Sequence, residues 1–119
     1  MELKPEIVRD ILLTIEATKP RNKILKLSDL HRFAVSKQYI LDDVLYTVEK
    51  LVEAEFIKAD LDKIEVGQMT YNGHMFLETI KDRNVWEKTK AVVSKVEGVS
   101  LSILTDVASS ILKSYLIKE

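Results

Sequence analysis

Two histidines and one pair of adjacent aspartates are the residues of this 119-residue chain best suited to catalysis or metal binding. His31 and His74 are far apart in the sequence, and neither belongs to a His-Glu-x-x-His motif. Asp42 and Asp43 are neighbours, but adjacent helical residues point about 100° apart and do not share an acid–base site. We therefore expect both histidines to be surface or structural residues, with no metal site.

Other catalytic signatures are missing from the sequence. The chain has no cysteine, which excludes a thiol nucleophile, a thiolate metal site and a disulfide framework. Its three glycines are scattered and form no phosphate-binding loop, and no pattern typical of a nucleophile triad is present. The sequence predicts a protein that is not an enzyme and has no cofactor.

Composition indicates a folded protein with one main core. Hydrophobic residues make up 46% of the chain and charged residues 31%, as in ordinary globular domains. No apolar run approaches the roughly 20 residues that cross a bilayer. The N-terminal sequence lacks the basic-then-apolar layout of a signal peptide. We expect a cytoplasmic protein without membrane association.

Helical and alternating patterns succeed one another along the chain. Apolar spacing predicts helices over about residues 5–18, from Ser28, over 41–54, from Thr70, over 85–96, and from Ser100 or Ser102. Alternation predicts strands over 23–27, 56–60 and 63–66. Thr70 should cap its helix, and Gly73 should allow close packing near the start of that helix. Gly98 should end the fifth helix in a left-handed backbone conformation. The predicted inward positions of the fourth and fifth helices are Met75, Phe76, Leu77, Ile80, Trp86, Val92, Val93 and Val96.

This order of elements predicts an α+β fold that is mostly α. Helix, strand, helix, helix and two strands is the arrangement of a winged helix, a helix-turn-helix variant with a small β-wing. We expect a winged-helix domain over residues 1–83. Residues 84–119 should form a C-terminal α-helical hairpin, packed on that domain or forming a dimer interface.

Four stretches resemble a family of small uncharacterised bacterial and prophage proteins, known only as a domain of unknown function. They are "VRDILLTIE" (Val8–Glu16), "YTVEKLVEAEFI" (Tyr46–Ile57), "TYNGHMFLETIKDRNVWEKTK" (Thr70–Lys90) and "VSLSIL" (Val99–Leu104). The resemblance implies a winged-helix-like body and frequent carriage by phage or mobile elements. It implies no established activity and no site residues.

The stretch "LVEAEFI" also resembles transcription regulators, in which the third helix is often followed by Leu-x-x-Ala-Gly-Leu-Ile. Glu55 stands where glycine is common in that pattern. The sequence therefore predicts a helix end that differs from the usual one.

Charge is distributed unevenly, although the formal net charge is only −1. Residues 1–40 hold eight Lys or Arg against five Asp or Glu, residues 41–83 hold five against ten, and residues 84–119 hold five against four. The helix that would read DNA lies in the acidic middle segment. Phosphate contacts need basic residues, so this distribution weakens the case for DNA binding.

In a winged helix, the exposed residues near the N-terminus of the third helix enter the major groove of DNA. In this sequence, helical spacing predicts that Thr47 is one of those exposed residues. The candidate DNA or partner contacts are Arg32, Lys37, Tyr39, Asp42, Asp43, Tyr46, Lys50 and Lys63. Aspartates repel phosphate, although they can accept a hydrogen bond from cytosine. Tyr39 and Tyr46 could stack on a partner or cover the edge of the core. The cations Lys19, Arg21, Lys23 and Lys26 are better interpreted as a solvated face.

The C-terminal segment carries more apolar surface than a lone hairpin can hide. Its apolar side chains either fold back on the domain or meet a second copy, since burial is strongly favoured over exposure. By analogy with proteins that dimerise through terminal helices, we expect a homodimer. The candidate dimer interface is Trp86, Leu101, Leu104, Ile111, Leu112 and Tyr115.

Two functions remain open from sequence. The favoured one is an uncharacterised, non-enzymatic regulatory module that binds a protein partner through an acidic face or its C-terminal helices. The alternative is a dimeric DNA-binding transcriptional regulator that presents two third helices to its half-sites.

Overall fold

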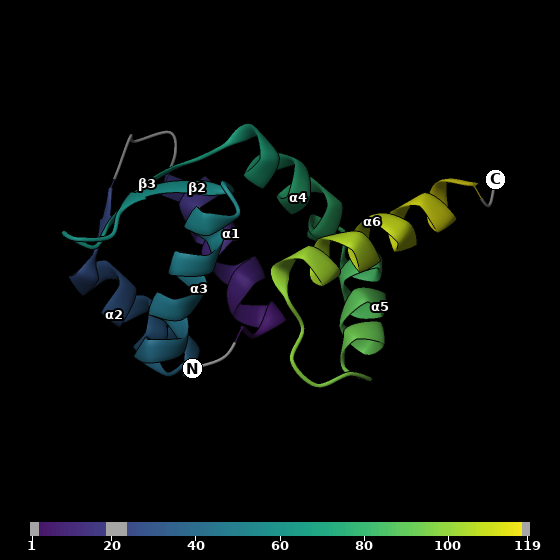
Figure 1. Ribbon diagram of the computed structural model, residues 1–119, viewed down its shortest axis with the longest axis horizontal. Coiled ribbons are helices and arrows are strands. Elements are labelled where there is room, and N and C mark those ends of the chain that lie inside the picture. The colour runs from purple at the N-terminus through teal and green to yellow at the C-terminus, as the bar shows by residue number, and fades with distance from the viewer. Residues whose placement is uncertain (1–2, 19–23, 118–119) are drawn as a thin grey trace.

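The protein is mostly α-helical and carries one small antiparallel sheet. The computed structural model describes residues 3–18 and 24–117, within an envelope of 45 × 31 × 24 Å (Figure 1). The elements, in chain order, are α1 (Pro5–Thr18), β1 (Leu25–Lys26), α2 (Leu27–Lys37), α3 (Leu41–Glu53), β2 (Ile57–Asp60), β3 (Glu65–Met69), α4 (Tyr71–Lys81), α5 (Arg83–Val93) and α6 (Leu101–Ile117). The predicted α+β class and the predicted order of elements are confirmed.

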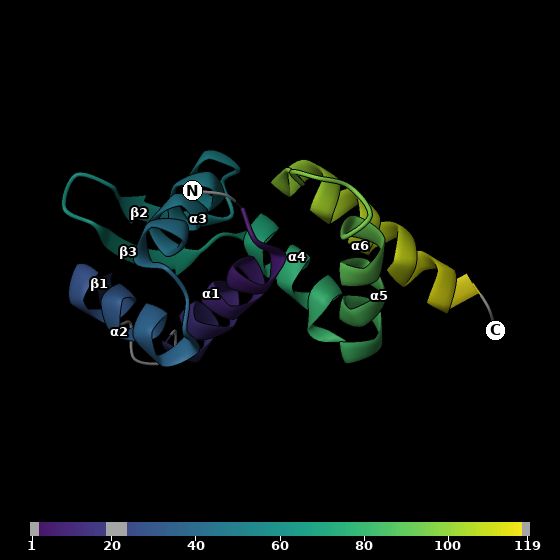
Figure 2. The same cartoon turned by 90° about the horizontal axis from the view of Figure 1, so that it is seen from below.

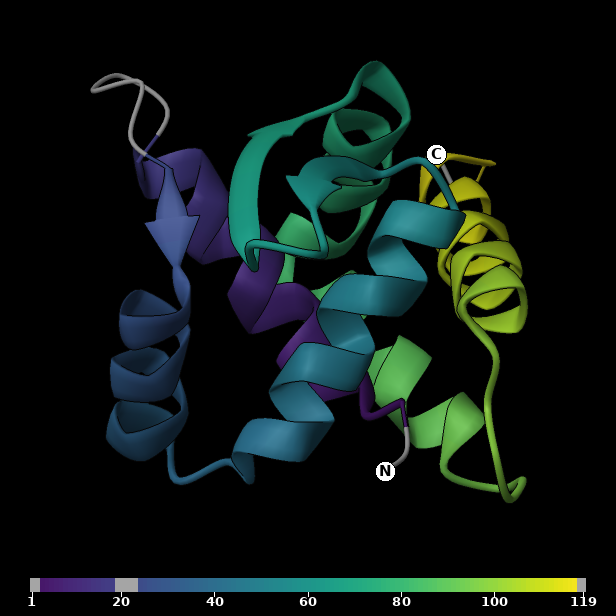
Figure 3. The ribbon, with the colours of Figure 1, turned by 60° about the vertical axis from the view of Figure 1, so that its left-hand side comes forward.

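The three strands pair in the order β1-β3-β2, with both pairs antiparallel. Leu25 lies opposite Val66, and Ile57 lies opposite Met69, with a register shift before Ala59. This places strands that are distant in sequence side by side at one end of the molecule, next to α2 and α3 (Figure 3).

The turn between β2 and β3 is longer than the alternation suggested. One carboxylate oxygen of Asp60 accepts hydrogen bonds from the backbone N–H groups of Asp62 and Lys63, at 3.1 and 3.2 Å. Ile64 follows with a left-handed φ of 54°. The second strand of this hairpin, β3, therefore begins at Glu65 rather than at Lys63, and the predicted boundary was wrong.

The start of α2 also differs from the prediction. The helix begins at Leu27, so Ser28 lies inside its first turn and is not the cap. Lys26 occupies the N-cap position instead, and the carboxylate of Asp29, in the first turn, accepts the backbone N–H of Lys26 at 2.9 Å. A carboxylate in the first turn also suits the positive end of the helix dipole.

The caps of α4 and α6 follow local sequence signals. The Thr70 hydroxyl accepts the backbone N–H of Gly73 at 3.1 Å, and the Ser100 hydroxyl accepts that of Ile103 at 3.1 Å. Each satisfies one of the free N–H groups of a first helical turn. Both predicted caps are confirmed, and Ser100 is the cap in preference to Ser102.

The fifth helix is displaced toward the N-terminus relative to its prediction. Asp82 caps it by accepting the backbone N–H of Val85 at 3.0 Å, so α5 begins at Arg83. It ends at Val93, and the connection to α6 runs over residues 94–100. Gly98 lies within that connection with a φ of 68°, so its left-handed conformation is confirmed although the helix ends earlier.

A single hydrophobic core joins both ends of the chain. It runs from α1, through α3 and the sheet, to α4, α5 and α6. Its largest fully buried side chains are Ile7, Ile11, Leu12, Leu30, Leu51, Ile57, Leu77, Ile80 and Leu104. α1 and α4 lie between the sheet-bearing end and the α5–α6 end of the molecule (Figure 1).

The C-terminal helices pack within the chain. Trp86, Leu101 and Leu104 are 5%, 8% and 0% exposed, respectively, and all belong to the common core. The prediction that these three form a dimer interface was therefore wrong: their apolar surface is already covered by α4, α5 and α6. Ile111, Leu112 and Tyr115 are half-buried.

Three predicted core positions face outward. Met75, Val92 and Val96 are 53%, 42% and 56% exposed. α4 buries Phe76, Leu77 and Ile80, and Met75 lies on the other side of that helix. Helical spacing identifies an apolar stripe, but the neighbouring elements decide where the edge of the stripe falls.

Polar contacts also tie α1 to the C-terminal half. The Arg9 guanidinium donates from Nε to the carbonyl oxygen of Ile80 at 3.0 Å and lies 5.6 Å from the Trp86 ring centroid. The Lys81 ammonium is 2.8 Å from a carboxylate oxygen of Glu16. These contacts fix the C-terminal end of α4, and with it the start of α5, against α1.

Candidate interaction surface

The outward face of α3 is acidic. Asp42, Tyr46, Glu49 and Glu53 follow the spacing i, i+4, i+7 and i+11, which places them along one side of a helix. The three carboxylates are exposed and Tyr46 is half-buried. We refer to these four residues as the acidic face of α3.

Asp43 does not belong to this face. Its side chain is buried, with the residue only 5% exposed, and its carboxylate oxygen lies 3.2 Å from the Lys4 ammonium. Thr47 is fully buried as well, and its hydroxyl donates to the Asp43 carbonyl oxygen at 2.7 Å. The expectation that both residues lie on the exposed surface of α3 was wrong, because both lie on the buried side of that helix.

Lys50 borders the acidic face but is already engaged. Its ammonium lies 3.2 Å from a carboxylate oxygen of Glu53 and 5.2 Å from the Tyr46 ring centroid. The hydrogen bond to Glu53 and the charge of that carboxylate raise the pKa of Lys50. One compensated ammonium beside three carboxylates leaves the outward surface of α3 negative.

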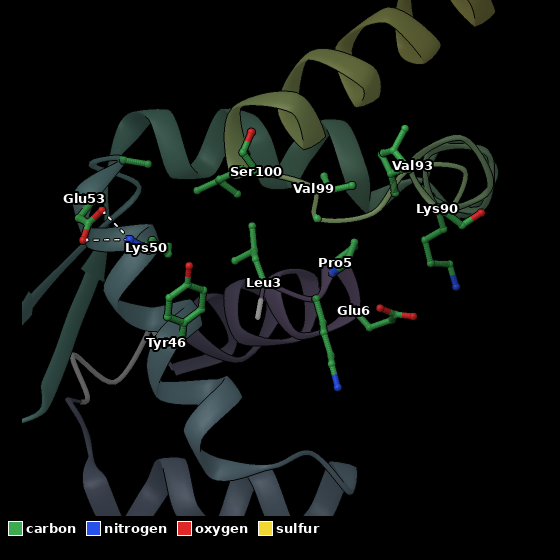
Figure 4. Close-up of a pocket in the computed structure, with 16 residues that line it drawn as sticks. Leu3, Pro5, Glu6, Tyr46, Lys50, Glu53, Lys90, Val93, Val99 and Ser100 are labelled. Atoms are coloured by element: carbon green, nitrogen blue, oxygen red, sulfur yellow. Dashed lines mark hydrogen bonds and ion pairs between the residues drawn. The ribbon is translucent and has the colours of Figure 1, made fainter. Parts of the chain in front are cut away.

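A groove of about 910 Å³ opens beside the acidic face (Figure 4). Tyr46 and Lys50 form one side, Leu3 and Pro5 come from the N-terminal segment, and Val99 comes from the α5–α6 connection. Further residues on its walls are Glu6, Lys90, Val93 and Ser100. The lining is apolar in its middle and charged at its edges, which is typical of sites that receive an apolar group flanked by polar ones.

Sequence reasoning missed this groove. Three distant segments form it, and helical periodicity does not report which of them meet. The one available signal was the presence of apolar residues outside predicted helices, namely Leu3 and Val99. Both pack partly against the common core, which positions the groove walls.

The remaining basic candidates are scattered. Arg32 is exposed and its guanidinium pairs with the Asp29 carboxylate on the same helix. Lys37 lies exposed at the end of α2, and Lys63 lies in the turn between β2 and β3. Of the predicted solvated cluster, Lys26 is exposed, whereas Lys19, Arg21 and Lys23 lie outside the described residues.

Tyr39 covers the edge of the core. Its hydroxyl donates to the Asp10 carboxylate at 2.6 Å, and its ring lies 6.0 Å from that of Phe33. Burial, followed by the hydrogen bond to Asp10, raises the pKa of Tyr39 above its usual range. The side chain links α1 to the α2–α3 connection, so of its two predicted roles the structure displays the packing role.

His31 is exposed on α2 and His74 is half-buried on α4. Within residues 3–18 and 24–117, no three His, Asp or Glu side chains gather closely enough to hold a metal ion. In the same ranges, none of the helices combines the length and apolar character needed to span a bilayer.

The chain belongs to the DUF2513 family, which is described as a hypothetical protein and whose sequence profile matches residues 2–100. The predicted resemblance to a domain-of-unknown-function family is thereby confirmed, whereas carriage by phage stays a prediction. No similar protein was found among curated proteins or among solved structures. The match covers α1 to α5 and ends just before α6.

Proposed function

We propose that this member of the DUF2513 family is a non-enzymatic winged-helix module that binds a protein partner through the acidic face of α3. An apolar side chain of the partner enters the neighbouring groove, and basic residues beside it meet Asp42, Glu49 and Glu53. The groove and the face share Tyr46 and Glu53, so one partner surface contacts both.

The winged-helix assignment is supported by the order of elements. A helix, a strand, two helices and two further strands precede α4, and β1 pairs with β3, which pairs with β2. In this interpretation β2 and β3 are the wing and α3 is the helix that the scaffold presents to its partner. α5 and α6 are then an addition that forms one wall of the groove.

The negative charge of α3 is the observation that carries this proposal. Duplex DNA attracts basic surfaces, and its phosphates repel three carboxylates placed along the presented helix. The same carboxylates attract a basic protein surface, where complementary charge speeds encounter and excludes wrong partners. Buried Asp43 does not contribute, so the attraction depends on Asp42, Glu49 and Glu53.

Charge reversal tests the proposal. A D42K/E49K/E53K variant of the full chain should bind a partner captured from the native cell at least tenfold more weakly. The three introduced lysines would repel the basic residues of the partner that the carboxylates attract. A matched D62K/E78K/E87K variant makes the same charge change on exposed residues that do not line the groove and should keep the affinity. Circular dichroism confirms that both variants fold. Equal loss in both variants, or loss in neither, would contradict the assigned face.

The alternative is a DNA-binding regulator, favoured by the same order of elements and by exposed Arg32 and Lys37 on α2. Gel-shift titration with random and native upstream DNA at low salt separates the two functions. Micromolar affinity that falls steeply with salt would favour the alternative. In that case R32E/K37E should weaken binding, and Asp42→Ala should strengthen it or relax its specificity.

A further inference from the structure

The outer side of α6 carries a regular stripe of exposed residues. The inner side packs Leu101, Leu104 and Ala108 against the core. The helix then extends past α5 at the end of the molecule farthest from the sheet (Figures 1 and 2). This leaves its outer surface free of the other described elements along its length.

Five residues form this stripe, with alternating spacings of three and four: Ile103, Asp106, Ser110, Lys113 and Ile117. All five are exposed, with Ile103 at 47% and Ile117 at 79%. Alternating spacings of three and four place these residues along one side of the helix, where a second helix can pack against them. We call these residues the outer seam of α6.

The charges of the outer seam are complementary to those of a second copy only when the two α6 helices are antiparallel. Asp106 and Lys113 are the only charged residues of α6, one in each half of the helix. In an antiparallel pair centred on Ser110, each Ile103 lies level with Ile117 of the partner subunit. Each Asp106 lies one residue, about 1.5 Å along the axis, from the level of Lys113 of the partner subunit, within reach of that long side chain. A parallel pair would instead place like charges opposite each other.

We propose that two copies of this protein associate through an antiparallel pairing of their α6 helices along the outer seam. The interface is two-fold symmetric: it has isoleucine pairs at both ends, ion pairs inside them and the small Ser110 side chains at the axis. The proposal is independent of the acidic face of α3. It uses the side of α6 opposite to the buried stripe that sequence alone suggested for a dimer.

Charge swapping tests the direction and the location together. For the full wild-type chain, sedimentation equilibrium from about 10 μM to 1 mM should show mass rising from monomer to dimer. K113E should weaken dimerisation about tenfold, because each symmetric ion pair becomes a repulsive acidic pair. D106K/K113E should restore it, since attraction returns with the charges exchanged. Lys58→Glu, an exposed lysine on β2, makes the same charge change and should leave dimerisation unaltered.

The absence of cysteine provides a second readout. Ser110→Cys should form an intermolecular disulfide under mild oxidation, whereas Ser36→Cys, exposed on α2, should not. A monomeric mass throughout the concentration range would overturn the proposal. So would a dimer that K113E leaves unchanged, one that D106K/K113E fails to restore, or equal cross-linking through Cys at 36 and 110. Circular dichroism of each variant separates these outcomes from loss of folding.

Discussion

Two places in the chain contain a residue with a left-handed backbone conformation, but they are built differently. One is the tight junction, where the residues that follow α3 meet the start of α4; the other is the open connection between α5 and α6. Glu55, at the end of α3, has a φ of 63°, and Gly98 has a φ of 68°. The Glu55 and Phe56 N–H groups donate to the Val52 and Leu51 carbonyl oxygens, each at 2.9 Å, which closes the last turn of the helix. Gly98 has no heavy atom within 4 Å of the position a Cβ would occupy.

The tight junction is formed by hydrogen bonds between Thr70, just before α4, and the residues that follow α3. Thr70 donates its hydroxyl to the Glu55 carbonyl oxygen and its N–H to that of Phe56, the latter at 2.9 Å. Gly73 lies so close that a Cβ there would be 2.1 Å from the Phe56 carbonyl oxygen. A left-handed glutamate is tolerated because these contacts fix the turn, whereas the open connection depends on glycine itself.

The largest effect should come from filling the tight junction. Gly73→Ala should destabilise the fold by about 3 kcal/mol, because the new methyl group must displace backbone and the Met69 side chain. Urea unfolding followed by circular dichroism measures the change. Gly67→Ala is the matched control, since its Cβ would lie 3.4 Å from the nearest heavy atom, and it should cost far less. Similar costs at both positions would remove the steric argument.

A smaller effect is expected in the open connection. Gly98→Ala should cost about 1 kcal/mol, because alanine disfavours a positive φ even where space is ample. The same unfolding assay applies. A cost as large as that of Gly73→Ala would mean that hidden contacts, and not conformational preference, dominate at residue 98.

The smallest effect has the opposite sign. Glu55→Gly should stabilise the fold by about 0.5 kcal/mol, as relief of the left-handed strain exceeds the entropy that glycine adds to the unfolded chain. Thermal unfolding should show a slightly raised midpoint. A lowered midpoint would show that the Glu55 side chain contributes more than its conformation costs.

Local signals made much of the fold predictable. The Thr70 and Ser100 caps depend on an oxygen and an amide three residues apart, and α1 shows its buried side through spacing alone. Glycine is common at position 55 in related patterns because this helix end is left-handed. The predicted difference there was wrong, since Glu55 adopts the conformation that glycine favours.

Long-range contacts account for the errors about which side chains are exposed. From the sequence, Asp43 resembles an exposed residue at the start of a helix, but it is buried and forms an ion pair with Lys4, which is distant in the sequence. The stripe containing Leu104 must be buried by something, but spacing cannot say whether α5 or a second copy buries it. The groove beside Tyr46 depends on three segments meeting, and it has no sequence signature of its own.

The burial of Tyr39, together with its hydrogen bond to Asp10, makes the stability of the fold depend on alkaline pH. An unfolded chain releases a tyrosine proton near pH 10, whereas native Tyr39, with its raised pKa, retains that proton. The stabilisation is therefore complete below about pH 10 and is lost as pH rises toward the native value. In strongly basic solution, loss of the Tyr39 proton removes the hydrogen bond that joins the α2–α3 connection to α1, and the folded state becomes less stable.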